Sequence, residues 1–179
     1  GDIGCYSLGV NAPFFGFDYS ICMGSGFSSL IGLQKALEAQ HDSRKAFGML
    51  GDSTFYHSGI TSLIDIVTTE SNVIACVLDN SITAMTGHQE NPGTAYNLMG
   101  YPSPSVDIET VVRAVGLDDD HIRIVDPLDI TSVEQAIEAG YAAHGPFVII
   151  TKRPCALIKE VAKRNAGVYC KVNPELCKS

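Results

Sequence analysis

The chain has 179 residues, of which 45% are hydrophobic and 18% are charged, and its formal net charge is −8. This length allows one domain with a substantial hydrophobic core. The negative charge argues against strongly anionic partners, so we expect neither nucleic acid nor an anionic membrane surface to be bound. The sequence contains no stretch with the length and apolarity of a transmembrane helix.

The cysteines are widely and irregularly spaced, which is not typical of a disulfide framework. Cys76 falls within an apolar run and is expected to behave as a small buried hydrophobic residue. We identify no signal peptide in these residues and expect a cytoplasmic protein. Because the chain opens at Gly1 on residues that already resemble a motif, we expect it to be a piece of a longer protein.

The first half of the chain alternates helical and strand patterns. Leucines at helical spacing predict a helix over 25–40, and an apolar run predicts a buried strand over 46–50. A second helix is expected over 57–70, followed by a strand over 73–78. Residues 81–104 contain several prolines and glycines without a clean period, which predicts a long loop. Loops of this length in compact domains usually have a function.

The second half continues this alternation. Asp107 is typical of an N-cap, and the apolar residues after it predict a helix that ends at Gly116. A strand is expected over 122–125, a helix over 131–143 whose first two residues lie near the cap, and a final strand over 147–151.

Alternating strands and helices predict an α/β fold, in which helices cover both faces of a mostly parallel sheet. In such folds ligands bind at the carboxyl ends of the strands. The apolar pattern fades from about Lys159, so we place one domain at 1–160 and a linker at 161–179.

The most informative pattern places oxygen-bearing side chains after two successive strands. Gly51-Asp52-Ser53 follows the first expected strand, and Asp79-Asn80 follows the second. Because one crossover helix would join these strands in parallel, we expect Asp52 and Asn80 at the same edge of the sheet. Their oxygens and the backbone carbonyl of Ile82 would suit Mg²⁺, and a diphosphate would complete its coordination shell.

Two helix N-termini would add N–H donors and positive dipole ends, one after Ser53 and one at Gly24-Ser25-Gly26. Taken singly, Gly-Asp-Ser and Asp-Asn are more often turns than ligands. Their occurrence at two successive strand ends favours the ligand interpretation.

The same two segments resemble the motif of thiamine-diphosphate enzymes, which usually reads GDG and, after an intervening helix, NN or DN. Ser53 departs from the usual Gly, and its hydroxyl could donate to a phosphate. Upstream, residues 22–26 resemble the segment in which a methionine lies under the bent cofactor; the alternative for an isolated methionine is a gap-filling core residue. The resemblance implies cofactor contacts from Met23, Gly24, Ser25, Gly51, Asp52, Ser53, Asn80 and Ile82.

Three longer segments, 1–9, 51–59 and 79–89, resemble the α subunits of indolepyruvate:ferredoxin oxidoreductases. The resemblance implies the diphosphate-binding part of an enzyme that oxidatively decarboxylates aryl 2-oxoacids. In this family coenzyme A takes the acyl group, and ferredoxin takes the electrons through iron–sulfur clusters. The glutamate that activates the cofactor belongs to a separate pyrimidine-binding domain, so we expect that domain and a second subunit as partners, and no turnover by this chain alone.

Two histidines are candidates for substrate or proton handling, because histidine titrates near neutral pH. His57 is expected to begin a helix next to Asp52, and His88 lies in the long loop. The alternatives are an ordinary helix-start residue for His57 and a solvated loop residue for His88.

The resemblance also concerns three cysteines. In related oxidoreductases, cysteines at the positions of Cys5 and Cys155 ligate the [4Fe–4S] cluster nearest the thiamine, together with an upstream Cys-x-x-Cys pair that these residues lack. We therefore expect no cluster in this chain alone, and ordinary buried thiols are the alternative. Cys177 lies where the family's ferredoxin-like domain begins, so 161–179 is expected to lead into such a domain.

Other classes of protein fit parts of the sequence. A non-oxidative thiamine decarboxylase or synthase would share the cofactor site but has no need of Cys5 and Cys155. A non-catalytic α/β interaction module would share only the fold. A nicotinamide-binding domain is disfavoured because Ser29 replaces the third glycine of its fingerprint, and a zinc site because no cysteine pair has ligand spacing.

Overall fold

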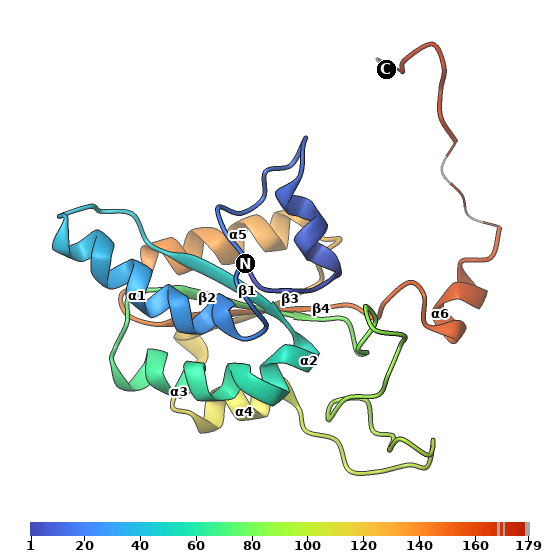
Figure 1. Cartoon of the computed structure of the whole chain (residues 1–179), viewed down its shortest axis with the longest axis horizontal. Helices are drawn as coiled ribbons and strands as arrows, with labels where there is room; N and C mark the ends of the chain where they lie inside the picture. The colour runs from blue at the N-terminus through green and yellow to red at the C-terminus, as the bar shows by residue number, and fades with distance from the viewer. Residues whose placement is uncertain (168, 170, 178–179) are drawn as a thin grey trace.

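The core of the molecule is a four-stranded, fully parallel sheet with the strand order β1-β2-β4-β3. It is seen in a computed structural model that describes residues 1–167, 169 and 171–177. The first two strands lie one residue later than predicted, so Gly51 and Asp79 belong to the sheet itself. The strands are β1 (Phe47–Gly51), β2 (Ile74–Asp79), β3 (Ile122–Val125) and β4 (Phe147–Lys152) (Figure 1).

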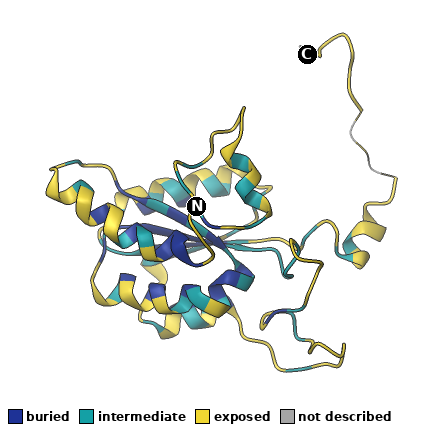
Figure 2. Ribbon diagram, in the orientation of Figure 1, coloured by how far each residue is buried: buried dark blue, intermediate teal, exposed yellow. Residues whose placement is uncertain are grey.

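Helices cover both faces of the sheet, which confirms the predicted α/β fold. One face packs against α1 (Ser25–Ala39), α3 (Ile60–Thr68) and α4 (Ile108–Ala114), whose buried residues share one core cluster. The other face packs against α5 (Ile130–Ala142) in a smaller cluster that includes Cys76, buried as predicted. Figure 2 shows that burial is concentrated in the sheet and in the sides of the helices that face it.

The helix that follows β1 begins earlier than the sequence predicts. Expected over 57–70, it continues without a break from α2 (Asp52–Thr54) through the π-helical turn η2 (Phe55–Gly59) into α3. Gly51 is still extended, so the chain changes from strand to helix within one residue. The apolar period starts only further along the helix, which is why the sequence pattern misses its first turns.

Two short helices and one cap also differ from the expectation. Neither the 3₁₀-helix η1 (Cys5–Val10) nor α6 (Lys159–Arg164) has buried residues, so neither carries an apolar period that the sequence could reveal. The cap of α5 is Asp129, and the helix begins at Ile130, one residue before the expected start. Ser132, expected near the cap, donates its N–H to Asp129 Oδ1 at 3.2 Å.

The segment between β2 and α4 is the long loop that the sequence predicts. An isolated bridge joins Thr83 to Gln89, and a second bridge closes another turn further along. Several apolar side chains of this loop are exposed, and Leu98 is 87% exposed. The loop ends at Asp107, which caps α4 as predicted.

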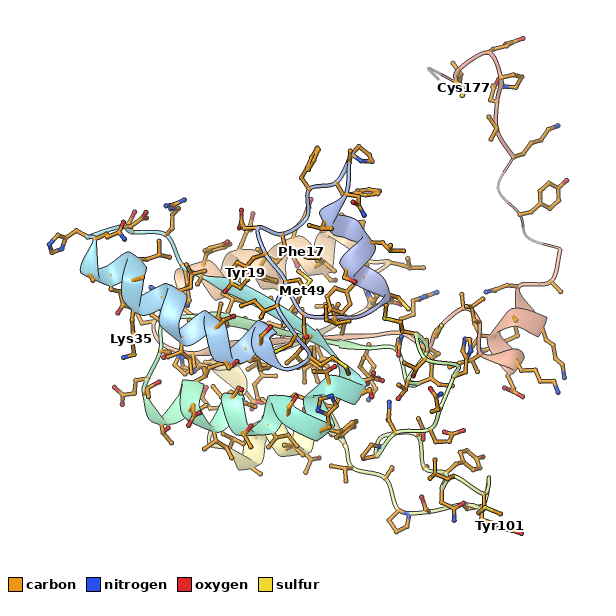
Figure 3. The ribbon with its side chains drawn as sticks, in the orientation of Figure 1. Phe17, Tyr19, Lys35, Met49, Tyr101 and Cys177 are labelled. Carbon is orange, nitrogen blue, oxygen red and sulfur yellow. The ribbon has the colours of Figure 1, made fainter. Side chains whose placement is uncertain are left out.

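β1 is an edge strand, and a groove of about 700 Å³ lies along it between α1 and α5. Phe17 and Tyr19 of the N-terminal segment line this groove together with Met49 of β1 (Figure 3). After α6 the described chain extends away from the sheet (Figure 1). None of the described helices is both long and apolar enough to cross a membrane.

Candidate functional site

The carboxyl ends of β1 and β2 carry the residues predicted as metal ligands. Gly51 pairs with Leu78 in the parallel register, so Asp52 follows beside the end of β2, and Asn80 comes directly after that strand. The N–H of Ile82 links the two side chains, because it donates to Asn80 Oδ1 at 3.2 Å and also stabilises the Asp52 carboxylate. The structure therefore brings Asp52, Asn80 and Ile82 together at one edge of the sheet.

The Asp52 side chain is almost fully buried, with 4% of the residue exposed. Its Oδ1 accepts the N–H of Ser53 at 2.6 Å, and its Oδ2 accepts Nδ2 of Asn91 at 3.2 Å. Burial raises the pKa of Asp52 to about 6; Asp79 adds to this rise, whereas the hydrogen bonds from Ser53, Asn91 and Ile82 oppose it. Among the described residues no cationic side chain forms an ion pair with Asp52.

A residue in the left-handed conformation directs the chain after β2. Ser81 has a φ of 60°, and its N–H donates to Asp79 Oδ1 at 2.9 Å. This conformation is uncommon for a residue with a side chain. Thr83 Oγ1 then donates to Ser53 Oγ at 3.0 Å, which fastens the start of the loop to the start of the helix after β1.

The oxygen atoms at this edge fit a hard divalent cation. Asp52 offers a carboxylate and Asn80 an amide oxygen, which are ligands that Mg²⁺ accepts. A cation would also offset the buried charge of Asp52. Within the described ranges, no group of three or more His, Cys, Asp or Glu side chains could hold a metal ion. A cation at this edge would therefore also need oxygens from amides, the backbone or a bound ligand.

The N-terminus of α1 is occupied by an aspartate that the sequence analysis does not single out. Asp2 is completely buried, and its carboxylate accepts the N–H groups of Ile3 and Gly24 at 2.6 and 2.7 Å. Burial raises the pKa of Asp2. The Ser25 hydroxyl donates to the carbonyl of Cys22 at 2.7 Å. Gly24 and Ser25, both predicted to contact the cofactor, thus already have hydrogen-bond partners within the chain.

Met23, predicted to lie under the cofactor, is 47% exposed just before α1. Gly24 after it has a φ of 95°, and a Cβ there would lie 2.5 Å from Ser58 Oγ, so this position requires glycine. Met23 is therefore partly accessible to a ligand.

Both candidate histidines are exposed. His57 lies within the π-helical turn and not at the start of a helix, which corrects its predicted position. The next residue, Ser58, packs against Gly24 at the N-terminus of α1, so His57 lies close to that helix end. His88 has a φ of 63° and precedes Gln89, which bridges to Thr83 in the long loop.

Of the predicted cluster cysteines, Cys155 lies beside the candidate site, because its backbone N–H donates to the Asn80 carbonyl at 2.9 Å. Cys5 is exposed on η1, and Cys177 lies on the C-terminal tail, far from the sheet (Figure 3). Cys170 falls outside the described residues.

Two residues beside Asp52 are not assigned a role by the sequence analysis. A polar pocket of about 190 Å³ adjoins Asp52 and is lined by Tyr56 and Asn91 among others. The Tyr56 hydroxyl donates to the carbonyl of Val106 at 2.6 Å. Asn91 sits in an Asn-Pro-Gly sequence that reads as an ordinary turn, so only the structure reveals its bond to Asp52.

Comparison with protein families gives one match that covers most of the chain. The model of the C-terminal TPP-binding domain of thiamine pyrophosphate enzymes matches residues 2–151. Asp52, Asn80 and Ile82 lie within this range.

The chain is also similar to archaeal oxidoreductase subunits. It is 37% identical to the indolepyruvate oxidoreductase subunit IorA of Archaeoglobus fulgidus over 93% of this chain and 26% of that protein. It is 38% identical to the corresponding subunit of Pyrococcus horikoshii over 98% of this chain and 28% of that protein. The chain thus spans about a quarter of the length of these curated relatives.

Solved structures share the fold at low sequence identity. A 2-oxoglutarate:ferredoxin oxidoreductase from Magnetococcus marinus, with coenzyme A among its bound ligands, matches with a TM-score of 0.67 and 16% identity, over 86% of this chain and 53% of that one. A 4-hydroxybenzoylformate decarboxylase from Rhodococcus jostii matches with a TM-score of 0.53 and 19% identity, over 75% and 25% of the two chains. Both proteins support the thiamine-diphosphate-binding fold.

Proposed function

The chain belongs to the thiamine pyrophosphate enzymes, as their C-terminal cofactor-binding domain, and we propose that it holds the diphosphate of thiamine diphosphate through Mg²⁺. Asp52, Asn80 and the Ile82 carbonyl would bind the metal, with diphosphate and water oxygens completing its shell. The observation that carries this proposal is the buried Asp52 carboxylate, whose pKa is raised to about 6 by burial and which has no cationic partner among the described residues.

Residues around this ligand set would bind and orient the diphosphate. The Ser53 hydroxyl accepts from Thr83, so its own proton remains available to a phosphate oxygen. Gly51 ends β1 where the following helix begins, and a helix N-terminus favours an anion. Gly24 and Ser25 bond within the chain, so their part would be to hold the N-terminus of α1 in place.

The bound cofactor would supply a thiazolium carbon that is nucleophilic toward the carbonyl of a 2-oxoacid. Met23 would support that ring, because this residue is partly exposed just before α1. His57 and His88, both exposed, would handle protons or substrate.

We further propose that the longer protein oxidatively decarboxylates an aryl 2-oxoacid such as indolepyruvate in the cytoplasm. Coenzyme A would take the acyl group and ferredoxin the electrons, one at a time. Support comes from the names of the curated relatives and from the coenzyme A bound to the Magnetococcus enzyme.

The remaining parts of such an enzyme would come from outside this chain. A pyrimidine-binding domain and a second subunit would complete the cofactor site. Residues 1–160 would be the diphosphate-binding domain, and 161–179 would lead into a ferredoxin-like domain. Cys5, Cys155 and Cys177 would ligate [4Fe–4S] clusters once further thiolates are present.

The test is an anaerobic assay of the longer protein with its partner subunit, indolepyruvate, coenzyme A and oxidised ferredoxin. We expect acyl-CoA and reduced ferredoxin, and none from this chain alone. D52N should lower kcat/KM by roughly 100-fold or more. D65N, which changes an exposed carboxylate of α3, should leave kcat/KM unchanged. Aldehyde release without ferredoxin reduction would support the non-oxidative alternative, and full activity of D52N would refute the metal site.

A further inference from the structure

One buried side chain of the long loop contacts the proposed metal ligand. Asn91 is 9% exposed, and its Nδ2 donates to Asp52 Oδ2 at 3.2 Å. Most of the loop around it is exposed or half-buried. A buried amide at such a position is held by specific bonds, because leaving its polar atoms without partners is costly.

The amide group of Asn91 is held by its own turn. The side-chain Oδ1 of Asn91 accepts the N–H of Gly93 at 2.9 Å. The backbone carbonyl of Asn91 accepts the Thr94 hydroxyl at 2.8 Å. These bonds leave Nδ2 directed at Asp52. The turn therefore uses the acceptor of the side chain itself and presents the donor to Asp52.

The same turn is fastened to the helix that starts at Asp52. A Cβ at Gly93 would lie 2.5 Å from Tyr56 Oη, so the loop backbone packs directly against this ring. The Tyr56 hydroxyl donates to the carbonyl of Val106 at 2.6 Å, and the Val106 N–H donates to the carbonyl of Pro92 at 2.9 Å. The middle of the loop, at Pro92 and Gly93, thus meets the end of the loop at Val106 around Tyr56, and the Asn91 amide next to this contact bonds to Asp52.

We propose that Asn91 is a positioning residue that orients the Asp52 carboxylate for the metal. The inference rests on the proposed function, since it assumes that Asp52 binds Mg²⁺. Ser53 fixes Oδ1 and Asn91 fixes Oδ2, so the plane of the carboxylate is set from both sides. Each carboxylate oxygen still has a lone pair for a cation. Partners of metal ligands typically change metal affinity by about 10- to 100-fold when removed.

The first experiment is a double-mutant cycle on the metal-free, full-length protein, with N91A, D52A and the double variant compared by midpoint temperature. If Asn91 acts through Asp52, the drop caused by N91A should shrink by more than half in the D52A background. N97A is the matched control: Asn97 caps a turn of the same loop by accepting from Met99 and Tyr101, and its effect should add to that of D52A. An additive N91A effect overturns the proposal.

The second experiment measures the Mg²⁺ concentration that half-saturates thiamine diphosphate binding to the full-length protein. We expect about a 10-fold rise for N91A and for N91L, which keeps the branched shape of the side chain without its polar atoms, and no change for N97A. If the half-saturating Mg²⁺ concentration rises for neither Asn91 variant while the wild type still binds, the positioning role is overturned but the proposed function is not. A wild type that binds no thiamine diphosphate with Mg²⁺ overturns the proposed function and this inference with it.

Discussion

The two ends of β1 each bury an ionisable side chain, and they differ in how its charge is balanced. Lys45, just before the strand, is 8% exposed and donates from Nζ to the carbonyls of Gly140, Ala143 and Gly145 at 2.8, 3.1 and 3.1 Å. These bonds use all three N–H donors of the ammonium group. The carbonyls lie at the C-terminal end of α5, where a helix favours positive charge. Burial nonetheless lowers the pKa of Lys45.

Asp52, directly after the strand, has donors but no opposite charge among the described residues, and Asp79 lies beside it. The two ends of β1 therefore have different roles. The chain itself completes the Lys45 end, which therefore serves stability. The Asp52 end keeps an excess of negative charge, which a cation would complete.

The largest expected effect concerns the Lys45 end. K45M removes the donor of three carbonyls and should lower the free energy of unfolding by about 2–4 kcal/mol, because buried acceptors lose their partners. K35M, at an exposed position of α1, should change it by less than about 0.5 kcal/mol. Urea unfolding of both variants measures this, and an equal effect would mean that the Lys45 contacts contribute no stability.

The second prediction concerns the Asp52 end, where removal of the buried charge is expected to raise the free energy of unfolding. Because the folded pKa of Asp52 is raised from 3.8 to about 6, its favourable contribution is present below pH 4 and is lost as the pH rises through 6. Without metal, D52N should therefore be more stable than the wild type at pH 7 by at most about 3 kcal/mol, and the difference should vanish near pH 4.

Urea unfolding in EDTA between pH 4 and 7 measures this difference. D65N, at an exposed position of α3, is the control and should change the free energy of unfolding by less than about 0.5 kcal/mol. With Mg²⁺ and thiamine diphosphate added, the order should reverse, because only the wild type would be stabilised by binding. A D52N protein that is less stable than the metal-free wild type at pH 7 would contradict the account of this end.

The smallest expected effect concerns the N-terminal end of α5. The C-terminal end of this helix is the one whose carbonyls bond to Lys45. D129A should lower the free energy of unfolding by about 1 kcal/mol, because it removes the N-cap that accepts from Ser132. T131A should change it by less than about 0.5 kcal/mol. Thermal unfolding distinguishes the two, and a larger cost for T131A would place the cap where the sequence pattern put it.

The parts of the molecule that the sequence predicts are those governed by periodic burial and by strand ends. The central strands β2 and β4 are buried on both faces, so apolar runs reveal them, and the parallel pair of β1 and β2 carries Asp52 and Asn80 to the same edge. The strand end predicts a helix N-terminus after Ser53, but the periodic pattern places the helix only from residue 57, because the first turns carry few apolar residues.

The residues that the sequence analysis misses depend on contacts between distant segments. Asp2 and Asn91 are bound by groups far away along the chain, and each lies in a sequence that reads as a common turn or motif. Lys45 is buried only because α5 ends beside it. No local pattern encodes these contacts, since a lysine or an asparagine between elements is usually exposed.

The most direct test of the central claim is a calorimetric titration of this chain with thiamine diphosphate, in saturating Mg²⁺ and in EDTA. The account predicts binding heat in Mg²⁺ for the wild type and D65N, and none in EDTA or for D52N. Binding that is independent of Mg²⁺, or equal for D52N and the wild type, would contradict a metal-bridged diphosphate at the end of β1.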